Sequence, residues 1–185
     1  MTKTENSTST PNRDPALQAL LDKQEITDVL NLYLRGADRA DTDLIAAAYH
    51  PDAIEEHGGL YMGPADAYVA MMDEQLPHAK YMNHLCTNII IELDGDKAHV
   101  ESYILAYSRM KKDGEKFDSL TLARAVDRFE RRDGAWKIAK RQLIWEWNND
   151  MPCAETWGRG LITNDPSKLI RGKKKPDDLV YAAKG

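Results

Sequence analysis

Apolar residues in the first part of the chain follow a helical period. From Leu17 to Ala37 they recur every three or four positions, over about six turns of helix. Asp14 is placed to cap this helix, and Pro15 to occupy its first position, where a missing N–H costs no hydrogen bond. Two shorter helices are predicted, one for residues 42–50 with its stop before the proline that follows, and one for residues 64–76.

After the third helix the pattern changes to four runs that are typical of strands. They span residues 83–93, 97–110, 116–130 and 135–148. An Asp-Gly pair lies in each of the three turns between them, which is a strong signal for antiparallel hairpins. Two further short strands are predicted around Gly58 and Gly59. The sequence therefore predicts an α+β domain, in which one curved and mostly antiparallel sheet wraps three N-terminal helices.

The segments on either side of residues 14–148 lack this periodicity. Residues 1–13 are polar and rich in Ser and Thr, and we expect a disordered leader there. Residues 149–185 contain clusters of Pro, Gly and Lys. We expect them to form an arm that lies over a neighbouring subunit or over the mouth of a pocket.

Length and composition narrow the class of protein. A chain of 185 residues is the size of one domain with tails. No apolar run approaches the ~20 residues that span a bilayer, and no apolar signal segment is present, so we expect a cytoplasmic protein without a membrane partner. The basic run at residues 171–175 has no interleaved aromatics, which argues against nucleic acid. Cys86 and Cys153 are expected to be reduced thiols.

Several catalytic motifs are absent. The sequence has no P-loop, no dinucleotide-binding glycine pattern, no nucleophile elbow, no paired CxxC and no HExxH, which leaves phosphoryl, hydride and acyl-serine chemistry without support. Glu55 and His57 alternate onto one side of a predicted strand and could join a further metal ligand. The five histidines otherwise show no ligand spacing, so we expect no metal and no cofactor.

The stretch YMNHLCTNIIIEL, residues 81–93, places His84, Cys86 and Asn88 on one face before the apolar pattern begins at Ile90. We interpret this face as the lining of a pocket, with His84 as a general base, because an imidazole titrates near neutrality. The alternative is a core histidine that bonds a backbone carbonyl.

Asp38 lies at the edge of the apolar stripe of the first helix, unusually close to the core for an acid. A carboxylate in contact with an imidazole fixes its tautomer and stabilises the imidazolium. The alternative role for Asp38 is to cap the second helix.

Four segments resemble the SnoaL-like branch of the NTF2-like superfamily: NLYLRGADRADTDLIAAAYHPDA, YMGP, HLCTNIIIEL and RFERRDGAWKIAKRQ. The resemblance covers roughly residues 17–148. It implies a cone-shaped α+β barrel with a deep apolar pocket, and an activity like that of the cofactor-free and mostly trimeric lyases of the family. In those lyases an Asp at the end of the first helix pairs with a His at the start of a strand, and Asp38 and His84 occupy these positions.

The resemblance also implies two further catalytic candidates. Tyr33 matches a pocket tyrosine and Arg141 an arginine of the dehydrochlorinase type. A phenol and a guanidinium can stabilise negative charge on a leaving oxygen or a carbonyl. The alternatives are simple packing for Tyr33 and a cross-strand ion pair with Asp127 or Glu130 for Arg141. The candidates for substrate binding are Tyr49, Cys86, Asn88 and Trp145.

These observations predict a cofactor-independent lyase that eliminates water, formaldehyde or a halide from a hydrophobic aromatic or polycyclic hydroxylated molecule. Two alternatives stay open: an isomerase or cyclase of the steroid or polyketide type, and a non-catalytic NTF2-like subunit of a ring-hydroxylating dioxygenase. Leu143, Trp145 and Trp147 alternate onto one face of the last strand, which indicates a subunit interface. We therefore expect a homo-oligomer, with a trimer favoured over a dimer.

Overall fold

The computed structural model describes residues 14–79, 81–154 and 165–182. The predicted leader, residues 1–13, lies outside the described residues. The helices are α1 (Pro15–Arg39), α2 (Thr42–Ala47), α3 (Ala65–Gln75) and the short α4 (Leu179–Ala182), with 3-10 turns at Leu76–His78 and Pro166–Lys168. The strands are β1 (Tyr49–His57), β2 (Met62–Pro64), β3 (Tyr81–Asp94), β4 (Lys97–Lys112), β5 (Glu115–Arg132) and β6 (Ala135–Pro152).

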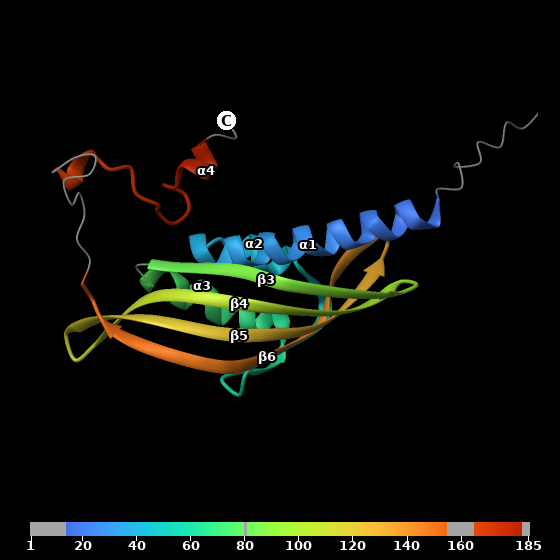
Figure 1. Ribbon diagram of the computed structural model, residues 1–185, viewed down its shortest axis with the longest axis horizontal. Coiled ribbons are helices and arrows are strands. Elements are labelled where there is room, and N and C mark those ends of the chain that lie inside the picture. Colours follow the sequence, from blue (N-terminus) through green and yellow to red (C-terminus); the bar gives the residue numbers. More distant parts are fainter. Residues whose placement is uncertain (1–13, 80, 155–164, 183–185) are drawn as a thin grey trace, which may run out of the picture.

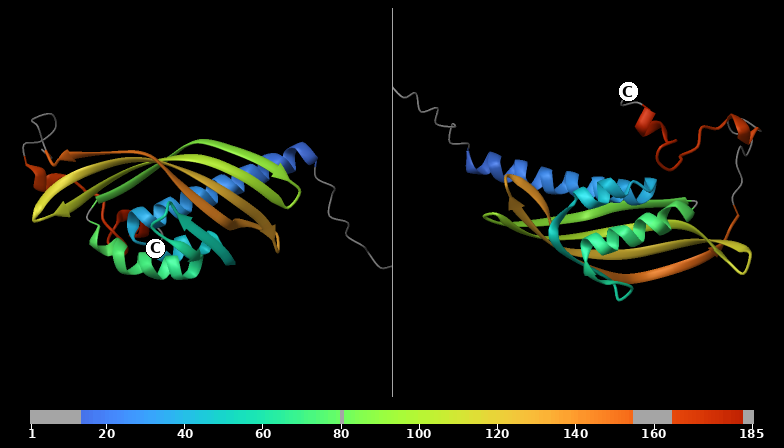
Figure 2. Two further views of the ribbon diagram at one scale, coloured as in Figure 1. Left: turned by 90° about the horizontal axis from the view of Figure 1, so that it is seen from below. Right: turned by 180° about the vertical axis from the view of Figure 1, so that it is seen from behind.

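The six strands form one sheet in the order β2-β1-β6-β5-β4-β3. The hairpins from β3 to β6 are antiparallel, as the Asp-Gly turns predict, while β1 runs parallel to β6. The sheet is long, twisted and open, with β2 and β3 at its edges, and α1 to α3 lie against its concave side (Figures 1 and 2). The predicted α+β cone is confirmed.

Helix α1 starts as its sequence predicts, but the predicted apolar stripe is buried only from Ile26 onward, since Leu17, Leu20 and Leu21 are exposed. The backbone N–H of Ala16 donates to the Asp14 side chain at 2.9 Å, which satisfies one of the free donors of the first turn. Ile26 and Leu30 are buried in the core. The helix ends at Ala40, whose φ of 52° is left-handed. None of the helices in the described parts of the chain is long and apolar enough to cross a membrane.

The second helix is shorter than predicted. Helix α2 ends at Ala47, and Tyr49 and His50 already belong to β1. Pro51, which the sequence analysis interpreted as a helix stop, lies inside this strand. The strand tolerates a proline because its pairing with β6 slips between Tyr49 and Ile54, so no ladder hydrogen bond is required there.

The last strand is longer than predicted and contains two bulges, one at Ala139 and one at Glu146. Ala123 pairs with Trp145 but Leu122 pairs with Trp147, so Glu146 is an extra residue in β6. One extra residue reverses the alternation of side chains. Trp147 therefore lies on the convex face with Leu122, and the prediction that it shares a face with Leu143 and Trp145 is wrong.

The C-terminal segment lies against the end of α1 (Figure 1). The Lys174 Nζ donates to the backbone carbonyl of Asp38 at 2.9 Å, and the backbone N–H of Lys175 donates to that of Arg39 at 2.7 Å. The Asp178 carboxylate lies 3.4 Å from the Arg39 Nε. Residues 165–182, called the arm below, thus hold the last turn of α1.

The turn between β1 and β2 makes a sharp prediction about stability. Gly58 has a φ of 55°, and a Cβ there would overlap the Trp145 indole, whereas Gly59 has a φ of 83° and open space around it. We expect Gly58→Ala to lower the free energy of unfolding by about 2–4 kcal/mol, and the matched control Gly59→Ala by about 1 kcal/mol. Urea unfolding followed by tryptophan fluorescence measures both. Equal losses would contradict a close contact between Gly58 and Trp145.

Candidate active site

The end of α1 and the first half of β3 bring Asp38 and His84 together. The His84 Nδ1 lies 2.7 Å from Asp38 Oδ1, and the backbone N–H of His84 donates to Oδ2 at 3.2 Å. With Nδ1 as the donor, Nε2 carries the lone pair. The two side chains are 18% and 15% exposed, so the ring keeps an accessible edge. Asp38 does not cap α2, whose N-cap residue is Asp41.

Arg141 forms the cross-strand ion pair that the sequence analysis offered as the alternative to catalysis. Its Nε and Nη2 donate to the two Asp127 oxygens at 2.9 and 2.7 Å, and both residues are 1% exposed. Burial alone would lower the pKa of Arg141, but Asp127 outweighs it and the pKa lies well above the usual value. Nη1 has no hydrogen-bond partner within the described residues.

Three tyrosines surround this ion pair. The Arg141 guanidinium lies over the Tyr33 ring, with Cζ 4.3 Å from the ring centroid. The Tyr33 hydroxyl donates to the Tyr68 hydroxyl at 3.4 Å, and Tyr33 meets Tyr49 edge-on at 5.8 Å. Burial raises the pKa of all three phenols. They are therefore neutral at physiological pH and act as hydrogen-bond donors.

A second pair of carboxylate and imidazole was not assigned to the site by the sequence analysis. Glu55 is fully buried. The Tyr49 hydroxyl donates to Glu55 Oε2 at 2.6 Å, and the His57 Nδ1 lies 2.8 Å from Glu55 Oε1. The His57 ring stacks on Tyr68 at 5.1 Å. The alternation of Glu55 and His57 in the sequence could have indicated this pair, but it was interpreted only as a possible metal site. The described residues hold no cluster suited to a metal ion.

The candidates for substrate binding are dispersed. Cys86 is half-buried on the concave face, and burial raises the pKa of its thiol. Trp145 is 44% exposed, and its Nε1 donates to the Gly58 carbonyl. Asn88 is exposed, with a φ of 50° at a slip in the pairing of β3 with β4. The prediction that Asn88 shares the face of His84 is wrong, because the bulge turns Ile89 inward instead.

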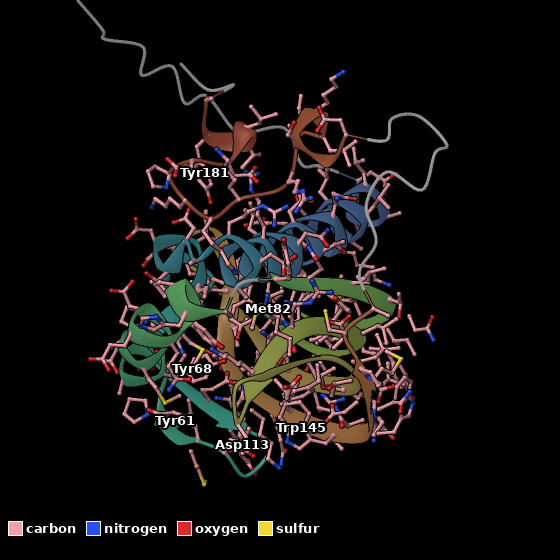
Figure 3. The ribbon with its side chains drawn as sticks, turned by 90° about the vertical axis from the view of Figure 1, so that its left-hand side faces the viewer. Tyr61, Tyr68, Met82, Asp113, Trp145 and Tyr181 are labelled. Carbon is pink, nitrogen blue, oxygen red and sulfur yellow. The ribbon has the colours of Figure 1, made fainter. Side chains whose placement is uncertain are left out.

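Two cavities lie on this side of the sheet, and Asp38 lines one of them. The α3 cavity, of about 800 Å³, lies between α3 and the sheet and is lined by His57, Tyr61, Tyr68, Met71, Met72 and Met82, among others. Figure 3 faces this side of the molecule and labels Tyr61, Tyr68 and Met82. The arm cavity, of about 690 Å³, is lined by Asp38, Met82, Tyr107, Arg109 and the arm. His84 lines neither, but Met82, two residues earlier on the same face of β3, lines both.

The family is clear from the sequence. Residues 18–142 match the model of the SnoaL-like domain, which is more than half of the chain, and the protein belongs to this family. No match was found among curated protein sequences.

Similar solved structures have the same fold. A protein assigned as a scytalone dehydratase from Novosphingobium aromaticivorans is 21% identical with a TM-score of 0.66, covering 76% of this chain and 99% of its own. A hexachlorocyclohexane dehydrochlorinase of type 3 from Novosphingobium barchaimii is 21% identical with a TM-score of 0.66, covering 74% and 94%. A protein assigned as an aromatic ring hydroxylase from Novosphingobium aromaticivorans is 19% identical with a TM-score of 0.63, covering 71% and 94%.

The ion pair of Arg141 and Asp127 gives the second prediction. Asp127→Asn leaves a buried guanidinium without its counter-charge, and we expect the free energy of unfolding to fall by about 3–5 kcal/mol. The double variant Asp127→Leu with Arg141→Met buries no charge and should be more stable than the single variant. Urea unfolding checks both. An Asp127→Asn variant as stable as the wild type would show that Asp127 is not what neutralises Arg141.

Proposed function

We propose that this protein is a cofactor-independent lyase that acts on a hydrophobic aromatic or polycyclic hydroxylated molecule. In this proposal His84 takes a proton from carbon, and a β substituent leaves as water, with formaldehyde or halide loss as variants of the same chemistry. The observation that carries the proposal is the 2.7 Å contact of His84 Nδ1 with Asp38, which fixes the tautomer that keeps Nε2 basic.

The elimination follows from the chemistry of these groups. The proton passes from substrate carbon to His84 Nε2, the electrons of the C–H bond form a C=C bond, and the C–O bond breaks. Asp38 stabilises the imidazolium that results. Tyr68 lines the α3 cavity and accepts a hydrogen bond from Tyr33, so its own hydroxyl proton is placed to be donated to an oxygen on which charge grows. Arg141 contributes only through its one unpaired nitrogen, because Asp127 holds the others.

The relatives agree with elimination as the reaction class. Two similar structures bear the names of a dehydratase and a dehydrochlorinase. The mostly apolar and aromatic lining of the α3 cavity favours a ring-containing substrate. We further propose a homo-oligomer, because Leu85 and Ile90 are more than half exposed on the convex face and Trp147 is 46% exposed.

A second candidate is a non-catalytic subunit of a ring-hydroxylating dioxygenase. One similar structure is assigned as an aromatic ring hydroxylase, and the same exposed convex face could bind a larger catalytic subunit. This candidate predicts that Asp38 and His84 can both be changed without effect on assembly or activity of the complex. Isomerisation is the third candidate, in which a carboxylate is the base and His84 is dispensable.

The test is a panel of hydroxylated aromatics followed by ultraviolet absorbance, which detects a new conjugated double bond. We expect one compound class to respond, His84→Gln to lower kcat by about 10²–10⁴-fold, and Asp38→Asn by about 10²-fold or more. His99→Gln, an exposed histidine on β4, is the matched control. Full activity in His84→Gln would favour an isomerase, and a panel without response beside a tightly bound larger subunit would favour the dioxygenase candidate.

A further inference from the structure

The α3 cavity presents an imidazole that the proposed elimination does not use. His57 lines this cavity and its side chain is 24% exposed, whereas its partner Glu55 is fully buried. With Nδ1 directed at Glu55, the free Nε2 belongs to the accessible part of the ring. The remaining lining is mostly apolar, from Leu60, Met71, Met72, Leu76 and Met82. A ligand in this cavity therefore meets a largely apolar wall, and His57 is one of the polar side chains that it can reach.

The two oxygens of Glu55 are both engaged, one by Tyr49 and one by His57. This arrangement prevents the carboxylate from turning and holds the imidazole in one tautomer. Tyr68 stacks on one face of the ring, and Trp145 meets it edge-on at 5.7 Å. His57 is thus fixed in orientation by three elements, β1, α3 and β6. A group used to transfer a proton requires such fixed geometry.

The buried charges inside the cone determine how Glu55 and His57 interact. Glu55, Asp127 and Arg141 are buried ionisable groups of this region, and Arg141 is bound to Asp127. Glu55 is left without a cation of its own among the described residues, apart from His57 when that ring is protonated. A buried carboxylate is most costly when it is uncompensated. A carboxylate in contact with an imidazole stabilises the imidazolium form of the ring, in which Nε2–H can donate to a ligand.

We propose that Glu55 and His57 form a second acid–base pair, which binds the hydroxyl oxygen of an aromatic alcohol or phenol in the α3 cavity and protonates it when the carbon–oxygen bond breaks. This rests on the elimination proposed above. His84 receives the proton from carbon, the C–H electrons form the C=C bond, and His57 Nε2 gives its proton to the departing oxygen, so that water rather than hydroxide leaves. Solvent then returns a proton to His57 and removes one from His84.

The rim of the cavity supports an ionisable aromatic ligand. Lys111 and Lys116 lie opposite each other across β4 and β5 and line the cavity. Their charge attracts an anionic or acidic oxygen to the mouth. The groups that face His57 or the cavity from other elements and can titrate are Tyr61, Tyr68, His78, Arg109, Lys111 and Lys116. Arg109 is itself bound to Asp118 by two hydrogen bonds.

Binding of 4-nitrophenol to the full chain tests the pair without requiring turnover, since its absorbance distinguishes phenol from phenolate. We expect saturable binding to the wild type, at least tenfold weaker binding to His57→Gln, and a change below twofold for the control His99→Gln. Equal binding to the wild type and His57→Gln would overturn the inference, as would the absence of saturable binding to the wild type. A tenfold loss in His84→Gln with none in His57→Gln would overturn it too.

Glu55 acts through His57, so its test must measure a property of the His57 ring that would not change if Glu55 served only in packing. The imidazole ¹⁵N signals of His57, assigned by their loss in His57→Gln, should show Nδ1 protonated in the wild type and respond to 4-nitrophenol at Nε2. In Glu55→Leu, which has no acceptor for Nδ1–H, the preference for a proton on Nδ1 should disappear. An unchanged tautomer in Glu55→Leu, or signals in the wild type that do not respond to the probe, would refute the pair.

Turnover separates this inference from the function on which it rests. With a substrate found in the panel, we expect His57→Gln to slow water loss by about 10²-fold. Loss in His57→Gln but not in His84→Gln would reject His84 as the base while keeping His57 as the acid. Loss in His84→Gln alone would reject the acid role and leave the proposed base intact.

Discussion

Arg141 and Asp127 share two hydrogen bonds on the concave face of the sheet, where neither reaches solvent. A buried charge needs a partner. Because Asp127 occupies Arg141, the second buried acid, Glu55, needs hydrogen bonds from other residues. These come from Tyr49 and His57 on its own strand. The resulting contacts tie β1 to α3 through the stacking of His57 on Tyr68. The interior of the cone thus contains linked polar pairs beside its apolar core.

Bulges in β3 and β6 decide which side chains enter this interior. In β3 the pairing shifts between Thr87 and Ile90, so the polar face ends after Cys86. From there Ile89, Ile91 and Leu93 face the core. In β6 the extra residue Glu146 keeps Trp145 inside and moves Trp147 outside. Each bulge adds one residue to one strand, and a period of two makes that enough to exchange the faces. The site and the exposed convex surface are therefore both consequences of single-residue insertions.

Local signals explain how much of the fold could be predicted. The cap at Asp14 and the Asp-Gly turns depend on neighbouring residues alone, and they located α1 and the meander of β3 to β6. The approach of Asp38 to His84, 46 positions apart, followed from the family resemblance, because no spacing rule connects a helix end with a strand. The start of β1 at Tyr49, the bulges and the partner of Arg141 depend on tertiary pairing. For that reason the sequence patterns mispredicted the first two and left the partner open between Asp127 and Glu130.

The arm gives the C-terminal part of the chain a direct connection to the acid at the end of α1. Lys174 and Lys175 bond the carbonyls of Asp38 and Arg39, which are the last turn of the helix that carries the carboxylate. A fusion partner or affinity tag added at that end would be attached to the segment that makes these contacts. Purification handles for assays of this protein therefore belong at the N-terminal end, ahead of Asp14, where the helix begins far from the carboxylate.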